Sequence, residues 1–255
     1  MKSAWKQVAA AATLTTVLAA ASTAQAQSRT TVNAEPAESK WSADLAFGID
    51  NSISGNINSS GVGRINDQAV VILKKPYEEV YGTGLHVRFG GGYMLDPVSE
   101  VLVTFAFQSA DADLTPLGDI GASKLYAQYA DYQSFSLDVG FRRYANLSRK
   151  VRAYGEASIG VAILDETDVV LIAPSTNLVE HATDFYDKTA ALTLGSNAGV
   201  VFRAAERIDL YGQLGVRYVG GMSPVDSLVG TGLEKINDNS ARWTLPVMLG
   251  ARFRF

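Results

Sequence analysis

The chain has 255 residues, of which 47% are hydrophobic and 19% are charged, with a net charge of −4 at pH 7 and no cysteine. Without cysteine there is no disulfide framework, no thiol nucleophile and no thiolate metal site. The mildly acidic balance argues against a nucleic-acid partner, because nucleic acids are bound by strongly basic surfaces.

The first 26 residues have the three-part pattern of a secretory signal peptide. Lys2 and Lys6 form a basic start, an uncharged apolar run extends from Val8 to Ala21, and Ala24-Gln25-Ala26 is a small-x-small cleavage site. The apolar run is short for a membrane-spanning helix. We therefore expect residues 1–26 to be cleaved and residues 27–40 to form a flexible, polar periplasmic lead-in.

From Trp41 onward, apolar and polar residues alternate with a period of two. Because a tilted strand crosses a bilayer in roughly 9–11 residues, alternation in segments of this length is typical of an outer-membrane barrel. A soluble β-sandwich also alternates, so the strands alone leave both open. Eight such segments are found, at residues 41–50, 85–93, 101–108, 135–142, 151–161, 192–202, 209–218 and 242–255.

The connections between these segments alternate strictly between short and long. A barrel with short periplasmic turns and long extracellular loops has this rhythm, whereas a sandwich has no reason to place every long loop at one end. We therefore predict an all-β, transmembrane, up-and-down antiparallel barrel over residues 41–255, with eight strands, or ten if Ala69–Leu73 adds a strand pair. The short connections are residues 96–99, 145–150 and 204–207, and the long ones are 51–84, 109–133, 164–187 and 220–240.

Aromatic residues on the apolar face fall near the ends of the predicted strands. Two aromatic girdles are expected where amphipathic rings meet the lipid headgroups. The residues predicted at the inner, periplasmic rim are Trp41, Tyr93, Phe141, Phe202 and Phe255. Those predicted at the outer rim are Phe107, Tyr218 and Trp243.

The last strand resembles the C-terminal assembly signal of bacterial outer-membrane proteins. Gly250, Phe253 and Phe255 match its glycine and its two apolar or aromatic positions, whereas Met248 stands where a polar residue is often found. Over residues 41–255 the chain resembles the eight-stranded OmpA-like and opacity-porin-like β-barrel family. This resemblance implies a location in the bacterial outer membrane, contact with outer-membrane lipid, and recognition by the barrel-assembly machinery during biogenesis.

Several charged residues are predicted to face the barrel interior. An eight-stranded barrel is just wide enough for side chains to fill, and charges buried there must pair. The charges are expected to form a structural network that plugs the barrel; the alternative is a gated narrow pore in which the arginines favour anions. The predicted lumen charges are Asp44, Arg88, Asp138, Arg142, Arg152, Glu156, Arg217 and Arg242.

No catalytic residue, cofactor site or metal site is predicted. The lipid A deacylases of this barrel class use a His-x-Ser arrangement, but Arg88 occupies the serine position after His86, and His181 with Thr183 lies in a predicted loop. The glycines at 90–92 lie within a predicted strand and lack the context of a phosphate loop. The acidic loop residues do not match a calcium-binding motif; they are Asp111, Asp113, Asp165, Glu166 and Asp168.

These features predict a non-enzymatic outer-membrane barrel that contributes to envelope integrity or presents long loops for surface interaction. The alternatives are a small pore or hydrophobic-ligand conduit and, third, a lipid-modifying enzyme. The apolar runs Ala69–Leu73 and Val169–Ala173 lie in long connections. They are expected either to extend the barrel wall as β-hairpins or to form an exposed patch for a surface ligand or host partner.

Overall fold

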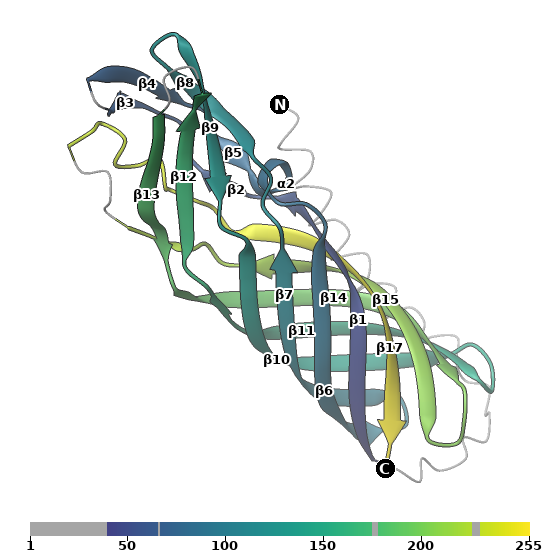
Figure 1. The fold of residues 1–255 in the computed structure, drawn as a ribbon. Helices are drawn as coiled ribbons and strands as arrows, with labels where there is room; N and C mark the ends of the chain where they lie inside the picture. Colours follow the sequence, from purple (N-terminus) through teal and green to yellow (C-terminus); the bar gives the residue numbers. More distant parts are fainter. Residues whose placement is uncertain (1–39, 66, 175–177, 226–229) are drawn as a thin grey trace.

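The computed structural model describes residues 40–65, 67–174, 178–225 and 230–255, and the side chains of residues 178–183 are not described. The predicted signal peptide and almost all of the lead-in lie outside these residues. Eight long antiparallel strands form a closed barrel (Figure 1), which confirms the predicted fold class and strand number. In order around the barrel, they are β1 (Trp41–Ser54), β17 (Arg242–Arg254), β15 (Ile208–Val219), β14 (Thr189–Arg203), β11 (Val151–Leu164), β10 (Tyr132–Asn146), β7 (Ser99–Ala110) and β6 (Gly84–Asp96).

The first and last strands close the barrel. β1 pairs with β17 in a register that places Asp44 opposite Arg252 and Ala43 opposite Phe253. On its other side β1 pairs with β6, with Trp41 opposite Tyr93. Every barrel strand therefore has two hydrogen-bonded neighbours, which is what a β-structure needs in lipid, where backbone groups have no water to bond.

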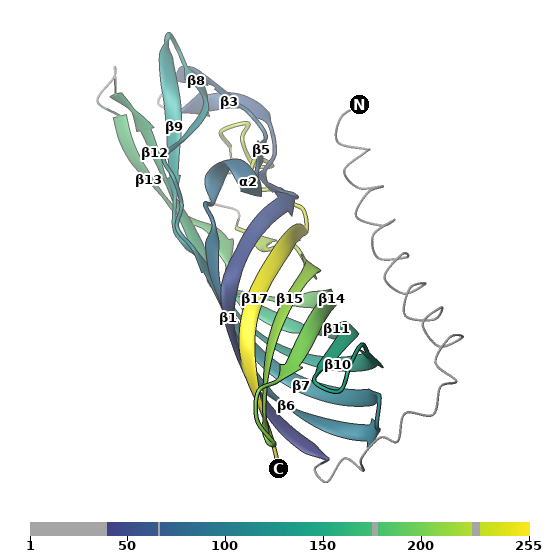
Figure 2. The ribbon, with the colours of Figure 1, turned by 90° about the vertical axis from the view of Figure 1, so that its right-hand side faces the viewer.

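The three tight turns, at residues 97–98, 147–150 and 204–207, lie at one end of the barrel, where the C-terminus also lies (Figure 2). The four long connections lie at the other end. This arrangement confirms the predicted alternation of short and long connections. We call the two ends the tight-turn end and the cap end.

The long connections are themselves folded and form a cap, which we define as the described residues among 55–83, 111–131, 165–188 and 220–241. Its hairpins build a second sheet beyond the barrel (Figure 1). The two apolar runs are hairpin strands of this sheet and add no strand to the barrel wall. In order across the sheet, the strands are β16 (Ser223–Pro224), β13 (Leu178–Asp187), β12 (Thr167–Ala173), β9 (Ser123–Tyr129), β8 (Thr115–Ile120), β4 (Gln68–Ile72) and β3 (Gly61–Ile65); a smaller sheet pairs β2 (Asn56–Asn58) with β5 (Lys75–Pro76), and the short helix α2 (Tyr77–Val80) follows.

The cap has its own hydrophobic core. Val70 and Ile72 of β4 and Leu171 of β12 are buried in it. These residues therefore cannot belong to an exposed patch, and the alternative that the two apolar runs form such a patch is wrong for them. Val71, on the opposite face of β4, is 41% exposed. The remaining core residues include Ile57, Tyr77, Val80, Leu117, Ile120, Leu125, Tyr129, Phe185, Tyr186, Leu233 and Ile236.

The hydrophobic core of the cap continues into the cap end of the barrel. Inward-facing residues from five barrel strands belong to the same buried cluster as α2 and the cap sheet. Burial raises the pKa of Tyr77, Tyr129 and Tyr186, all in the cap, so these side chains stay neutral hydrogen-bonding groups. The barrel residues in the cluster are Ala110, Tyr132, Ala162, Leu164, Ala191 and Val219.

The outer wall of the barrel is apolar and exposed, as the alternation predicts. On β10, Leu137 is 47% exposed and Val139 is 51% exposed, whereas the intervening Asp138 is only 6% exposed; on β15, Leu214 is 59% exposed. Bulky apolar residues cover this face of every barrel strand, which is the surface that a bilayer would contact. Among the described residues, no helix has the length and apolar character needed to cross a membrane.

Candidate functional site: the lumen charge network

Arg142 is the centre of a buried charge network in the half of the barrel nearer the tight-turn end. The register places Arg142 of β10 directly opposite Glu156 of β11 and, on its other side, opposite Glu100 of β7. Its Nη2 lies 2.5 Å from Glu156 Oε2, and its Nη1 lies 3.5 Å from Glu100 Oε2. The Arg142 side chain is fully buried, so these carboxylates provide the compensation that a desolvated guanidinium needs.

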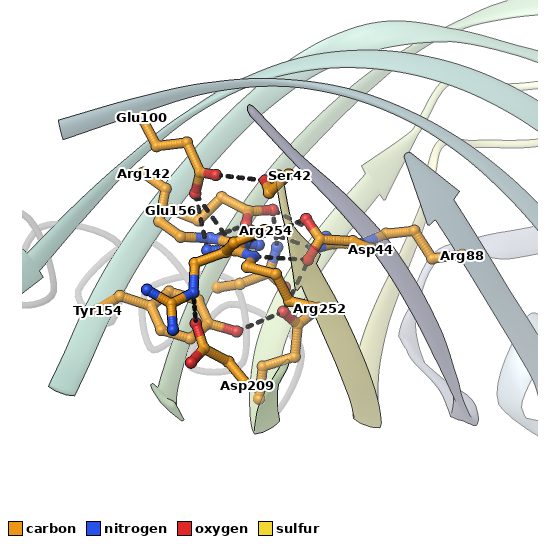
Figure 3. A network of polar contacts seen from close by, with 12 residues as sticks. Ser42, Asp44, Arg88, Glu100, Arg142, Tyr154, Glu156, Asp209, Arg252 and Arg254 are labelled. Carbon is orange, nitrogen blue, oxygen red and sulfur yellow. Dashed lines mark hydrogen bonds and ion pairs between the residues drawn. The ribbon is translucent and has the colours of Figure 1, made fainter. Parts of the chain in front are cut away.

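Arg252 on β17 links Glu100 to a further carboxylate, that of Asp44. It donates from Nε and Nη2 to Asp44 at 2.7 and 3.0 Å, which is a bidentate pair, and its Nη1 lies 3.0 Å from Glu100 Oε2 (Figure 3). Tyr144 donates to Glu100 at 2.6 Å and Ser42 donates to it at 2.9 Å. Glu100 of β7 is therefore fixed by groups from three other barrel strands.

Arg88 completes this group from β6. Its Nη1 donates to Glu156 Oε1 at 2.8 Å, and Asn197 donates to the same oxygen at 3.1 Å. We call the six residues Asp44, Glu100, Glu156, Arg88, Arg142 and Arg252 the central network. It contains equal numbers of carboxylates and guanidinium groups and is charge-balanced within itself.

Further polar contacts fill the lumen toward the cap end. Asp138 accepts from Thr193 at 2.5 Å and from Ser136 at 2.9 Å, and Arg217 lies 3.6 Å from it. A cavity of about 20 Å³ lies between this group and the central network. It has room for roughly one water molecule.

Arg242 closes the polar part of the lumen at the cap end. It donates to Ser52 at 2.8 Å, and its guanidinium lies 4.0 Å from the centre of the Tyr132 ring. Nearby, Gln108 donates to Asp50 at 2.6 Å. Above Tyr132 the apolar core of the cap begins.

The opposite mouth, at the tight-turn end, carries a separate cluster. Asp209 lies 3.3 Å from Arg254 and 3.6 Å from Arg152. Arg203 faces the same carboxylate across the β14–β15 pair. Figure 3 shows Asp209 and Arg254 beside the central network.

The structure brings four predicted lumen charges, Asp44, Arg88, Arg142 and Glu156, into one network and places Asp138 with Arg217 above it. Arg242 lies apart at the cap end and Arg152 at the tight-turn mouth. The sequence analysis did not include several charged partners of these lumen residues. One of them, Glu100, could have been found, because it lies on the same face of its strand as the inward-facing Leu102 and Thr104. The charges left out of the predicted network are Asp50, Glu100, Asp209, Arg252 and Arg254, although the alternation of the last strand already places Arg252 and Arg254 toward the lumen or its mouth.

The predicted girdle residues lie at the two ends of the apolar wall. At the tight-turn end, the rings of Trp41 and Tyr93 are 4.7 Å apart, and Phe141 and Phe202 are exposed. At the cap end, Tyr218 and Trp243 are 5.1 Å apart, and Phe107 packs against Phe135 at 4.9 Å; these distances join ring centres.

One residue of the predicted assembly signal, Gly250, also has a packing role. Phe253 and Phe255 are outward-facing, at 48% and 67% exposed. Gly250 lies against the ring of Tyr211: a Cβ added there would lie 2.5 Å from Tyr211 Cζ and 2.6 Å from the carbonyl oxygen of Leu45.

The two histidines are far apart in the fold. His86 is buried in the lumen, where its Nδ1 lies 3.5 Å from Gln108 Nε2, and His181 lies on β13 of the cap. His86 faces the arginines Arg88 and Arg217 across the small cavity. Within the described part of the chain, no group of three or more His, Asp or Glu side chains could hold a metal ion.

No family model matches the chain, and no curated protein matches it. Among solved structures, Neisserial surface protein A is similar over 84% of this chain and 96% of its own, at 12% identity and a TM-score of 0.43. A major outer membrane protein of Thermus thermophilus is similar over 84% and 99%, at 17% identity and a TM-score of 0.43. The outer membrane protease OmpT of Escherichia coli is similar over 88% and 99%, at 7% identity and a TM-score of 0.39. The strand pairing of the chain itself makes it a closed, eight-stranded antiparallel barrel with an apolar outer wall.

Proposed function

We propose that this chain is a non-enzymatic protein of the bacterial outer membrane, whose barrel is closed to solutes and whose folded cap acts at the cell surface. The observation that carries the proposal is closure at two levels. The central network fills the lumen near the tight-turn end with paired charges, and the apolar core of the cap fills the opposite end.

The two levels of closure argue against the pore and the conduit. A pore needs a continuous polar path, and the lumen cavity at about 20 Å³ does not supply one. A conduit for hydrophobic ligands needs an apolar channel, whereas side chains from the barrel and the cap pack against one another in the apolar end. A stable barrel with a rigid cap instead supports a role in envelope integrity or in surface interaction.

The enzyme alternative lacks support at the residues that would carry it. Lipid A lies outside the barrel, but His86 is 3% exposed and faces the lumen. The cavity beside His86 is lined by arginines and amides and also by Thr104, Ser158 and Asp138. The hydrogen-bond partner of His86 is the Gln108 amide and not a hydroxyl group, so the histidine is not placed to activate a nucleophile.

Location and role are tested together in cells. The mature protein should fractionate with the outer membrane, and unboiled samples should migrate differently from boiled ones in detergent gels. A deletion strain should be sensitive to detergent, and resistance should be restored by the intact protein and by His86→Ala, because the histidine is not catalytic. Recovery in the soluble periplasm would end the membrane proposal, and loss of a lipid A modification on His86→Ala would establish the enzyme.

Recognition by the assembly machinery is a further part of the proposal. Phe255 is 67% exposed, so its side chain buries little apolar surface that would contribute to stability. Phe255→Asp should therefore lower the outer-membrane yield in cells far more than Arg254→Gln, whereas both proteins should refold in vitro. Equal yields for the two variants would mean that Phe255 is not read during assembly.

A further inference from the structure

Basic residues are concentrated on one side of the tight-turn end. The β10–β11 turn carries Arg149 and Lys150, and the β14–β15 turn carries Arg207, with Arg203 at the end of β14. All four side chains are exposed. We call these four residues the basic rim.

The basic rim is contiguous because its strands are neighbours. β11 pairs with β14, and the Arg203 N–H donates to the Lys150 carbonyl at 2.8 Å. The Arg254 N–H donates to the Arg207 carbonyl at 2.9 Å, so the patch continues onto β17. Backbone hydrogen bonds thus hold the two turns and the last strand side by side.

Nearby carboxylates do not neutralise the basic rim. Glu206 is exposed in the β14–β15 turn, and the buried Asp209 already pairs with Arg152 and Arg254. Among the described residues, none of the four rim cations forms an ion pair. The patch therefore has an excess of positive charge.

The basic rim also lies at a membrane boundary. Phe202, which precedes Arg203, is 46% exposed, and Leu147 in the β10–β11 turn is 64% exposed. Both belong to the apolar outer surface at its tight-turn edge. Long cationic side chains at such an edge can extend to the headgroup level while their stems cover apolar surface.

We propose that the basic rim binds the phosphate headgroups of anionic phospholipids in the leaflet at the tight-turn end. This inference rests on the proposed membrane location and goes beyond it by naming a lipid class and a side of the barrel. Arginine and lysine near a membrane surface attract anionic lipids, and salt weakens this attraction because the charges are exposed. The opposite side of the same end has no such excess: Asp96, the last residue of β6, and Lys40, just before β1, carry opposite charges there.

The test compares lipid selectivity in defined vesicles. The protein is refolded in phosphatidylcholine vesicles with a minor share of phosphatidylglycerol, and spin-labelled forms of both lipids report the fraction restricted at the protein surface. The unmutated protein should prefer phosphatidylglycerol by about twofold or more, and the preference should fall toward one in high salt.

Two matched variants locate the preference. The rim variant combines Arg149→Gln, Lys150→Gln, Arg203→Gln and Arg207→Gln, and the cap variant combines Lys74→Gln, Lys124→Gln, Lys188→Gln and Lys235→Gln. Each removes four exposed cations, one set from each end of the molecule. The rim variant should lose the preference and the cap variant should keep it.

Two results would overturn the proposal: equal selectivity in the intact protein and the rim variant, or loss of selectivity in the cap variant alone. The heat-dependent gel shift verifies that each variant is folded. If the fourfold rim variant does not refold, Arg149→Gln with Arg207→Gln changes turn residues only and should remove part of the preference. The outcome is independent of pore closure, because an open barrel and a closed barrel expose the same rim.

Discussion

Arg142 and Glu156 are direct cross-strand partners on β10 and β11, and their side chains form a 2.5 Å ion pair in the barrel interior. Arg88 approaches Glu156 from β6, on the other side of the lumen, at 2.8 Å. One carboxylate on β11 therefore joins guanidinium groups from β10 and from β6, which is not a hydrogen-bonded neighbour of β11. The pairing ties the barrel together across its diameter as well as along its strands.

Glu156→Gln is expected to destabilise the barrel. The substitution keeps the side-chain shape but leaves Arg88 and Arg142 without their shared counter-charge, and removing one member of a buried pair costs about 3–5 kcal/mol. Reversible urea unfolding in vesicles measures the change. Asp119→Asn is the control: its pair with Lys124 is exposed and should contribute no more than about 1 kcal/mol. Equal stability of Glu156→Gln and the intact protein would show that the central network does not hold the barrel together.

Arginine substitutions on the outer wall test which residues face lipid. Leu137→Arg and Leu214→Arg should each cost about 2–4 kcal/mol, because both side chains lie on the apolar face near the middle of their strands. Val62→Arg is the matched control, since Val62 is 70% exposed on the cap and faces water. A negligible cost at both wall positions would contradict the assignment of the two faces.

Gly250→Ala is expected to destabilise the barrel for a reason of packing. The new methyl group would lie against the Tyr211 ring and against the Leu45 carbonyl oxygen, and the latter is backbone that cannot move aside. Overpacking of this kind costs about 1–3 kcal/mol. Gly155→Ala is the control, because nothing lies within 4 Å of its added Cβ. Similar unfolding curves for the two variants would limit the role of Gly250 to assembly.

Leu125→Ala should weaken the cap without dismantling the barrel. Leu125 is fully buried in the cap core, and removal of a buried leucine side chain typically costs about 2–5 kcal/mol. Hydrogen exchange should rise in the cap strands β8, β9 and β12, whereas β10 and β11 within the wall should remain protected. A uniform rise over both parts would show that the cap and the barrel unfold as one unit.

The barrel could be predicted from the sequence because the patterns that indicate it lie within single strands and single connections. Alternation along each segment identified the wall face, and the rhythm of connections identified the two ends. Partners in the lumen could not be predicted, because they depend on register between strands. The lumen charges were expected to pair, but only the pairing of β10 with β11 and the approach of β6 identify Arg142 and Arg88 as the partners of Glu156.

The second sheet of the cap could not be predicted from the sequence. Apolar residues such as Val70 and Leu171 were visible in the long connections, but their burial depends on hairpins from different loops joining in one sheet. The seven-stranded order brings β4 and β12 together through β8 and β9. Strand pairing between different long connections leaves no periodic pattern in the sequence of any one of them.

Planar-bilayer recording of the refolded protein tests the central claim, that the barrel is closed, most directly. The intact protein should be electrically silent, because paired charges fill the lumen at the central network and the cap core fills the other end. Glu156→Gln, which frees an arginine, should show at most small and irregular leak events. A large, steady conductance in the intact protein would contradict the account and establish the barrel as a channel.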